Sequence, residues 1–274
     1  MTRSICKTLS SAAVSVGLLA VLLASCATSP TGRNQMILKS DAALAAEGQR
    51  QFNMIRERMP LVQDRATIDY VACVSNAIVD QLEGEDAAMF WELAVIDQAD
   101  VNAFVLPGGK ISVFSGILTV AQNQHQLATV LGHEVAHVTA QHANERASRS
   151  MVAGVGVDIA AILLGGGYAN QTQAAQQTLG TGAMLGILNP FSRKQESEAD
   201  IIGLKYMAMA GFDPRESVTL WTNMEEKNES RVPEFMSTHP SGETRIESLV
   251  SQLPTALALY NEAKAQGKAP ACQR

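Results

Sequence analysis

The spacing of apolar positions predicts a mainly helical chain with one short β-rich region. Apolar residues recur at three- and four-residue steps over residues 40–59 and 68–82, which is the spacing of one helix face. Three β-prone runs then predict a small, largely antiparallel sheet: residues 91–96, 101–106 and 110–114. Helical patterns return over residues 124–146, 193–210, 242–252 and 254–266, and another helix is expected to start at Asp213. We therefore expect an α+β fold in which helices dominate.

The first 25 residues depart from this pattern and are typical of an export signal. Arg3 and Lys7 precede an uncharged apolar run, and Leu23-Ala24-Ser25-Cys26 is similar to the lipobox of bacterial lipoprotein signals. On this interpretation Cys26 is lipidated and residues 26–39 form a tether. The alternative is an ordinary cleaved signal with an incidental cysteine. The lipobox, with Ala27 after the cysteine, predicts a bacterial outer-membrane lipoprotein that faces the periplasm.

Charge and hydropathy exclude two classes of protein. The formal charge of −6 excludes a broadly basic nucleic-acid surface, so we expect no nucleic-acid partner. Beyond the N-terminal run, no uncharged apolar stretch is long enough to span a bilayer, which excludes a multi-spanning membrane protein. We expect residues 40–274 to form one domain.

The cysteines indicate one disulfide. If Cys6 leaves with the signal and Cys26 carries lipid, Cys73 and Cys272 remain in an oxidising compartment. A disulfide between these two residues is the natural inference. Two separate thiols stay open as the alternative, because the sequence contains no distance between them.

The motif that carries chemistry lies on the helix predicted over residues 124–146. His133-Glu134-Val135-Ala136-His137 has the H-E-x-x-H pattern. Four residues along a helix place the two imidazoles about 40° apart, so both can reach one metal ion. Glu134 can touch a water on the metal without binding the metal, which is the position of a general base. The alternative is a helix with surface histidines.

A catalytic zinc ion needs a third protein ligand and an open fourth position. His142 lies about 180° around the helix from His133, and His125 lies about 12 Å away along its axis, so neither is expected to close the site. A later predicted helix offers Glu196 and Asp200, four residues apart on one face. One carboxylate can bind the metal while the other hydrogen-bonds a ligand histidine.

These residues resemble the CAAX-prenyl-protease and HtpX family of zinc metallopeptidases. The resemblance rests on residues 129–138 and 196–200, and shorter matches extend it: residues 30–33, 102–104, 106–109, 211–214 and 238–240. The lipobox favours the periplasmic members of the LoiP and BepA type. The resemblance implies a mainly helical zincin (gluzincin) fold that holds one Zn²⁺ through His133, His137 and Glu196. It also implies that Asp200 supports this ligand set by hydrogen bonding.

The resemblance further implies how a substrate binds. An extended peptide is expected to add as a strand beside Asn102, Ala103 and Phe104. His239 is the best candidate for stabilising the oxyanion, and Arg245 is a weaker one. In some relatives this histidine instead reaches the zinc and plugs the site. That alternative stays open, as does a loop histidine with neither role.

Residues 148–192 join the two motif-bearing helices and contain short apolar stretches. Glycines interrupt these stretches, which are too short to span a membrane. One interpretation is a helical hairpin packed on the domain. The other is a mobile lid over the cleft, or a surface that touches lipid or an unfolded client.

Together these features predict a zinc metalloendopeptidase for protein quality control. Its expected partners are unfolded or misassembled envelope proteins as substrates, and the outer membrane through the lipid anchor. The alternative is a chaperone or outer-membrane assembly factor with a structural or regulatory metal site. An exopeptidase would need a group that recognises a chain terminus, and the sequence shows no such group.

Overall fold

The computed structural model describes residues 26–152, 191–228, 234–239 and 244–274. Most of them are helical. The helices are α2 (Asp41–Arg58), α3 (Arg65–Val79), α4 (Gly84–Ala88), α5 (Gln124–Thr139), α6 (His142–Val152), α10 (Arg193–Met209), α11 (Glu216–Asn228), α12 (Glu234–Thr238) and α13 (Arg245–Ala265). Among the described residues, none of these helices combines the length and the apolar character needed to cross a membrane.

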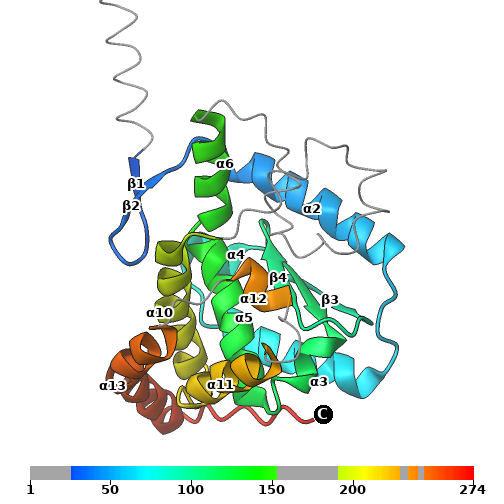
Figure 1. The fold of residues 1–274 in the computed structure, drawn as a ribbon, viewed down its shortest axis with the longest axis vertical. Coiled ribbons are helices and arrows are strands. Elements are labelled where there is room, and N and C mark those ends of the chain that lie inside the picture. Colours follow the sequence, from blue (N-terminus) through cyan, green and yellow to red (C-terminus); the bar gives the residue numbers. More distant parts are fainter. Residues whose placement is uncertain (1–25, 153–190, 229–233, 240–243) are drawn as a thin grey trace, which may run out of the picture.

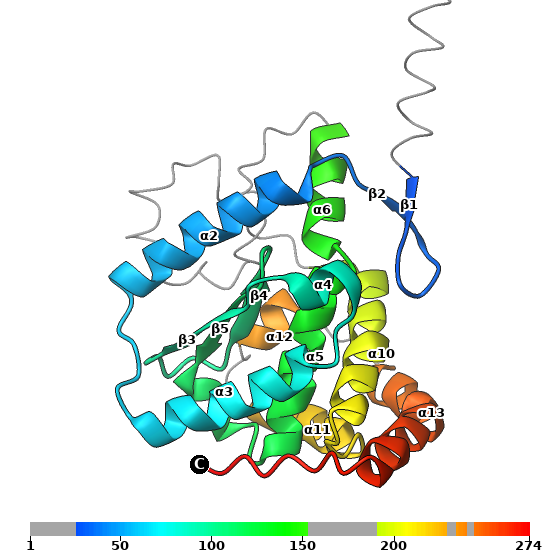
Figure 2. The ribbon, with the colours of Figure 1, turned by 180° about the vertical axis from the view of Figure 1, so that it is seen from behind.

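Helix α5 lies at the centre of the molecule (Figures 1 and 2). Residues 126–137 of this helix are all buried. The sheet lies on one side of α5, and α10, α11 and α13 lie on the other. A continuous apolar core connects α3, the sheet, α5, α10 and α11. The architecture confirms the predicted α+β class with helices dominant.

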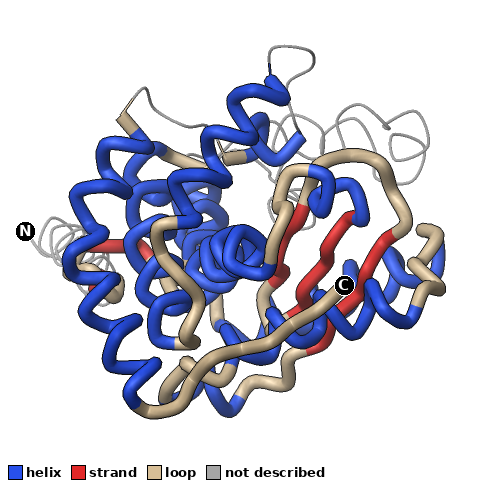
Figure 3. Tube along the Cα trace, turned by 90° about the horizontal axis from the view of Figure 1, so that it is seen from below, coloured by secondary structure: helices blue, strands red, loops and turns tan. Residues whose placement is uncertain are grey.

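A three-stranded sheet packs beside α5 (Figure 3). Its strands are β3 (Glu92–Ile96), β4 (Ala103–Leu106) and β5 (Lys110–Phe114), in the order β3-β5-β4. β4 and β5 form an antiparallel hairpin, whereas β3 pairs with β5 in parallel. The expectation of a largely antiparallel sheet is therefore wrong for one of the two pairings. β5 therefore lies between β3 and β4, and β4 is an edge strand of the sheet.

The chain turns sharply within the segment predicted as one long helix. Helix α5 ends at Thr139, Gln141 adopts φ 53°, and α6 begins at His142. This left-handed residue turns the chain, so the helix predicted over 124–146 is two helices. Near the C-terminus, by contrast, the two helices predicted over 242–252 and 254–266 are one helix, because α13 continues through Pro254. Pro254 is exposed, so water can bind the carbonyl that lacks its helical partner.

The segment expected to be a tether has a fixed structure. β1 (Cys26–Thr28) and β2 (Asn34–Met36) pair in an antiparallel hairpin, and Gly32 at the turn has φ 87°. The hairpin is attached to the domain through Arg33, which binds Glu145 of α6 and Glu198 of α10.

Helices α5 and α10 touch through their backbones at two glycines. A Cβ atom on Gly203 would lie 2.6 Å from the backbone nitrogen of His133, and one on Gly132 would lie 2.7 Å from the carbonyl oxygen of Gly203. Only glycine, which has no Cβ atom, fits at these two positions of the helix crossing. The crossing brings the helix that bears the H-E-x-x-H motif against the helix that bears Glu196 and Asp200.

Candidate metal centre

Three side chains from α5 and α10 converge on one buried point. The Nε2 atoms of His133 and His137 lie 3.1 Å apart. The Glu196 carboxylate lies 3.4 Å from each of these nitrogens, through Oε2 and Oε1 respectively. All three residues are buried. The structure thus brings together the two motif histidines and the acid that the resemblance assigns as third ligand.

The spacing of these donors fits a tetrahedral metal ion. Ligands about 2.0–2.1 Å from a zinc ion in tetrahedral geometry lie about 3.3 Å from one another. The nearest distances between His133, His137 and Glu196 are 3.1, 3.4 and 3.4 Å, and each histidine faces a different oxygen of the Glu196 carboxylate. Imidazole and carboxylate are ligands that zinc accepts. The donor set therefore fits zinc in both geometry and chemistry.

His239 lies at the fourth corner of this group. Its Nδ1 is 3.2 Å from Nε2 of His133 and 3.2 Å from Oε1 of Glu196. The candidate ligand atoms of all four residues lie within 4.8 Å of one another. Short helix α12 places His239 here, because its backbone nitrogen donates to the carbonyl of Phe235. This position matches the plugging alternative more closely than that of a free oxyanion donor.

Asp200 and Arg245 support the ligands from behind. Asp200 Oδ1 lies 2.9 Å from Nδ1 of His133, and Arg245 Nη2 lies 2.7 Å from the same oxygen and 3.3 Å from Glu196. Burial would raise the pKa of Asp200, but Arg245 and His133 lower it overall. The Arg245 guanidinium also lies over the ring of Trp221. Arg245 therefore holds the carboxylates in place and does not point to a free oxyanion site.

Glu134 is buried beside the edge strand. Within the described residues its Oε1 has no hydrogen-bond partner, and Nε2 of His239 lies 3.3 Å away. Burial raises the pKa of Glu134 to about 7, and the backbone of Val105 in β4 hydrogen-bonds its carboxyl group. A buried carboxylate with a raised pKa fits a proton acceptor.

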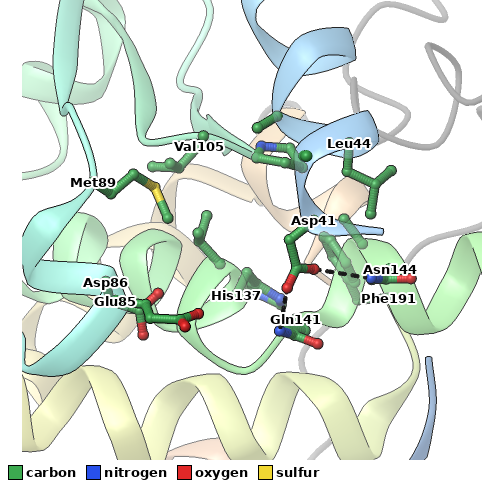
Figure 4. A pocket seen from close by; sticks show the side chains of 16 residues that line it. Asp41, Leu44, Glu85, Asp86, Met89, Val105, His137, Gln141, Asn144 and Phe191 are labelled. Atoms are coloured by element: carbon green, nitrogen blue, oxygen red, sulfur yellow. Dashed lines mark hydrogen bonds between the residues drawn. The ribbon is translucent and has the colours of Figure 1, made fainter. Parts of the chain in front are cut away.

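The expected substrate strand is buried in the structure. Ala103 and Phe104 belong to β4, while Asn102 precedes it and accepts a hydrogen bond from the backbone of Ala103. A cavity of about 290 Å³ lies beside β4, between α2 and the end of α5 (Figure 4). Val105 and His137 both line it. The cavity therefore connects the edge strand with the metal ligands.

Two residues that sequence reasoning set aside or overlooked belong to this site. Nδ1 of His142 lies 2.8 Å from Nδ1 of His137, and Nε2 of His142 lies 3.1 Å from Glu198. His142 is not one of the four candidate donors, as expected, but it lies beside His137 because α5 ends before it. Glu198 lies within residues 196–200, which the sequence analysis had selected, but nothing in the sequence linked it to His142. Phe191 is a further neighbour and stacks on His137 at 4.1 Å.

The remaining predictions concern residues other than the metal ligands. The structure joins Cys73 of α3 to Cys272 by a disulfide, with Cα atoms 5.7 Å apart. Cys26 lies in β1, and the predicted signal, residues 1–25, lies outside the described residues. Most of the predicted lid or hairpin over 148–192 also lies outside them, and only its ends are seen, in α6 and before α10.

Comparison with known proteins gives relatives in mitochondria and in bacteria. The chain is 42% identical over 168 residues to the mitochondrial metalloendopeptidase OMA1 of Schizosaccharomyces pombe, covering 61% of this chain and 48% of that one. The human OMA1 is 35% identical, with 62% and 33% covered. The β-barrel assembly-enhancing protease of Escherichia coli is 29% identical, with 73% and 41% covered. The chain spans about half or less of the length of these relatives.

These relatives correct the expected location. Six of them, at 34–42% identity, are named as mitochondrial proteins, whereas the two bacterial ones are 29% identical. The similarity is thus greater to the mitochondrial relatives than to the two bacterial ones. The prediction of a bacterial outer-membrane lipoprotein facing the periplasm is wrong by this comparison. It depended on a short motif at the N-terminus, which is weaker information than similarity over most of the domain.

The match to a family model covers all four residues of the candidate metal centre. The model of peptidase family M48 matches residues 66–253, which include both histidines of H-E-x-x-H, Glu196 and His239. The resemblance noted from the motifs is confirmed at this level. The chain belongs to peptidase family M48.

Proposed function

We propose that this protein is a zinc-dependent endopeptidase that cleaves unfolded or misfolded polypeptides. The observation that carries the proposal is the convergence of donors from His133, His137 and Glu196 at 3.1–3.4 Å, with the buried carboxylate of Glu134 beside them. Membership of peptidase family M48 supports it.

The residues of the site suit peptide hydrolysis. Zinc, when bound, supplies a Lewis acid that activates water and polarises a carbonyl group. Glu134 accepts the proton of the attacking water and passes it to the leaving amine. Asp200 and Arg245 keep His133 and Glu196 in place while the charge redistributes.

The edge strand explains why unfolded chains would be substrates. Among the described residues β4 pairs in the sheet with β5 alone, so its other side can pair with an extended peptide. Such pairing uses backbone hydrogen bonds and depends little on side chains. A folded protein rarely offers an extended strand, whereas a misfolded one does. The cavity between β4 and α2 can receive a substrate side chain.

Replacement of Glu134 by glutamine tests the proposal. Glu134→Gln keeps the shape of the side chain but removes the proton acceptor, so we expect casein cleavage to fall by about 10²–10⁴-fold. Zinc content, measured by metal analysis, should stay at one ion per chain. Glu226→Gln, at an exposed position of α11, is the matched control and should cleave casein like the unaltered protein. Full cleavage by Glu134→Gln would refute the proposal.

A chaperone with a structural metal site is the second candidate. The observation that favours it is the position of His239, which completes four protein donors, as structural zinc sites have. If this candidate is right, purified protein with bound zinc prevents aggregation of an unfolded client and Glu134→Gln does so equally well. Loss of zinc would then unfold the protein instead of only stopping hydrolysis.

A further inference from the structure

A line of buried hydrogen bonds runs from the metal ligand His137 to the N-terminal hairpin. Nδ1 of His137 faces Nδ1 of His142 at 2.8 Å, and Nε2 of His142 faces Oε2 of Glu198 at 3.1 Å. Glu198 in turn accepts hydrogen bonds from Thr31 and Arg33 of the β1–β2 hairpin. His142 is fully buried and Glu198 nearly so.

Tertiary structure holds every member of this line in place. His142 is the first residue of α6, directly after the turn at Gln141, and Glu198 is on α10. The Arg33 guanidinium bridges Glu198 and Glu145, with distances of 2.7–2.8 Å. Three segments distant in the chain therefore meet behind one metal ligand.

The order of donors and acceptors along the line follows from the chemistry of its ends. An ionised carboxylate only accepts, so the contact with Glu198 places a proton on Nε2 of His142. In a neutral imidazole the other nitrogen, Nδ1, is then an acceptor. The contact between the two rings needs one proton, which Nδ1 of His137 must supply. Nε2 of His137 is left with a free lone pair, directed at the other candidate ligands.

The reverse order would disable the ligand. If Nδ1 of His142 carried the proton, Nδ1 of His137 would have to accept it. The neutral His137 ring would then carry its proton on Nε2, which could not bind a metal ion. The direction of the whole line therefore decides whether His137 can act as a ligand.

We propose that His142 and Glu198 are positioning residues that hold His137 in its metal-binding tautomer and orientation, and that Arg33 of the N-terminal hairpin secures Glu198. The inference rests on the proposed function, because it takes His137 to be a zinc ligand. Asp200 serves His133 in a corresponding way, so each motif histidine has its own partner on α10, directly or through His142.

Zinc affinity of the 274-residue chain, measured by competition with a chromophoric chelator, tests this inference. His142→Phe fills the space of the ring without an acceptor, and we expect zinc affinity to fall by about 10–100-fold. His142→Asn places an oxygen close to the position of Nδ1, so it should recover most of that loss. His125→Phe removes a histidine at the far end of α5, the helix that carries His137, and should bind zinc like the unaltered protein.

Two further measurements separate positioning from folding. The melting temperature of each metal-free variant shows whether His142→Phe is folded. Imidazole ¹⁵N spectra of the unaltered, zinc-loaded protein should show the proton on Nε2 of His142 and on Nδ1 of His137. These spectra decide the inference even if His142→Phe does not fold.

The outcomes distinguish this inference from the proposed function. Equal zinc affinity of His142→Phe and the unaltered protein, or a proton on Nδ1 of His142, overturns the inference and leaves the endopeptidase proposal standing. Failure of the unaltered protein to bind zinc overturns both.

Discussion

Gly203→Ala would place a methyl group where the two helices that carry the candidate ligands touch. The new Cβ would lie 2.6 Å from the backbone nitrogen of His133 and 2.7 Å from the carbonyl carbon of Gly132. Ordinary contact distances between such atoms are about 3.5 Å. Both obstacles are backbone atoms of a central helix, so no side chain can rotate away. Helices α5 and α10 must therefore separate by roughly 0.8–0.9 Å.

This separation should damage the metal site more than the fold. Overpacking costs about 1–3 kcal/mol, but alanine favours a helix over glycine by about 1 kcal/mol, so the free energy of unfolding should fall by at most about 2 kcal/mol. Metal ligands tolerate deviations of only about 0.2 Å. The histidines lie on α5 and Glu196 on α10, so the three donors would no longer fit one ion. We expect zinc affinity to fall at least about 10-fold and peptide hydrolysis about 100-fold.

The assay compares zinc affinity, casein hydrolysis and the melting temperature of the metal-free protein. Lys205→Ala, at an exposed position of the same helix, is the control and should leave all three unchanged. If Gly203→Ala bound zinc and cleaved casein like the unaltered protein, the backbone contact would not be what positions Glu196, and the reasoning would be refuted. Unfolding of Gly203→Ala at room temperature would equally contradict the expected small loss of stability.

Three other predictions concern protonation, the fourth corner and the disulfide. Burial raises the pKa of Glu134 from 4.5 to about 7, so the metal-free fold binds this proton more tightly than the unfolded chain does. The free energy of unfolding that this proton contributes is present below pH 4.5 and is lost as the pH rises through 7. Metal-free Glu134→Gln should therefore be more stable than the unaltered protein at pH 8, by up to about 3 kcal/mol, and show no such gain at pH 4 in denaturant unfolding. His239→Ala should weaken zinc binding yet raise peptide hydrolysis, because it opens the fourth position; a fall of about 10²–10³-fold at saturating zinc would assign the oxyanion role instead. Replacing Cys73 and Cys272 by serine should lower the free energy of unfolding by at most about 5 kcal/mol, since the bridge closes a loop with a sequence separation of 199, and an unchanged unfolding midpoint would contradict this.

Local periodicity was sufficient for the elements that present the ligands. The helical repeat of 3.6 residues alone places His133 and His137 on one face, and the structure brings both rings to one point. The Ser192 cap and its capping box start the second helix where its pattern begins. Glu196 and Asp200 could be singled out as candidates from their spacing, but spacing did not distinguish ligand from support. That assignment required the family resemblance.

Contacts between distant segments could not be read in the same way. The pairing of β3 with β5, the turn at Gln141 and the position of His239 each depend on how separate elements pack. A helical projection assumes that the helix continues, so it placed His142 on the wrong side of a helix that had already ended.

Local patterns along the chain were enough to predict the helical class, the metal-binding motif and the elements that carry it, because these depend on side chains a few residues apart. The packing of the folded chain was needed to show that Gly132 and Gly203 let two helices meet backbone to backbone. It was also needed to show that His142 and Glu198 lie behind His137. The physical reason is that helix geometry is a local property of the chain. The approach of two helices depends instead on the shape of both surfaces together, which no single stretch of sequence specifies.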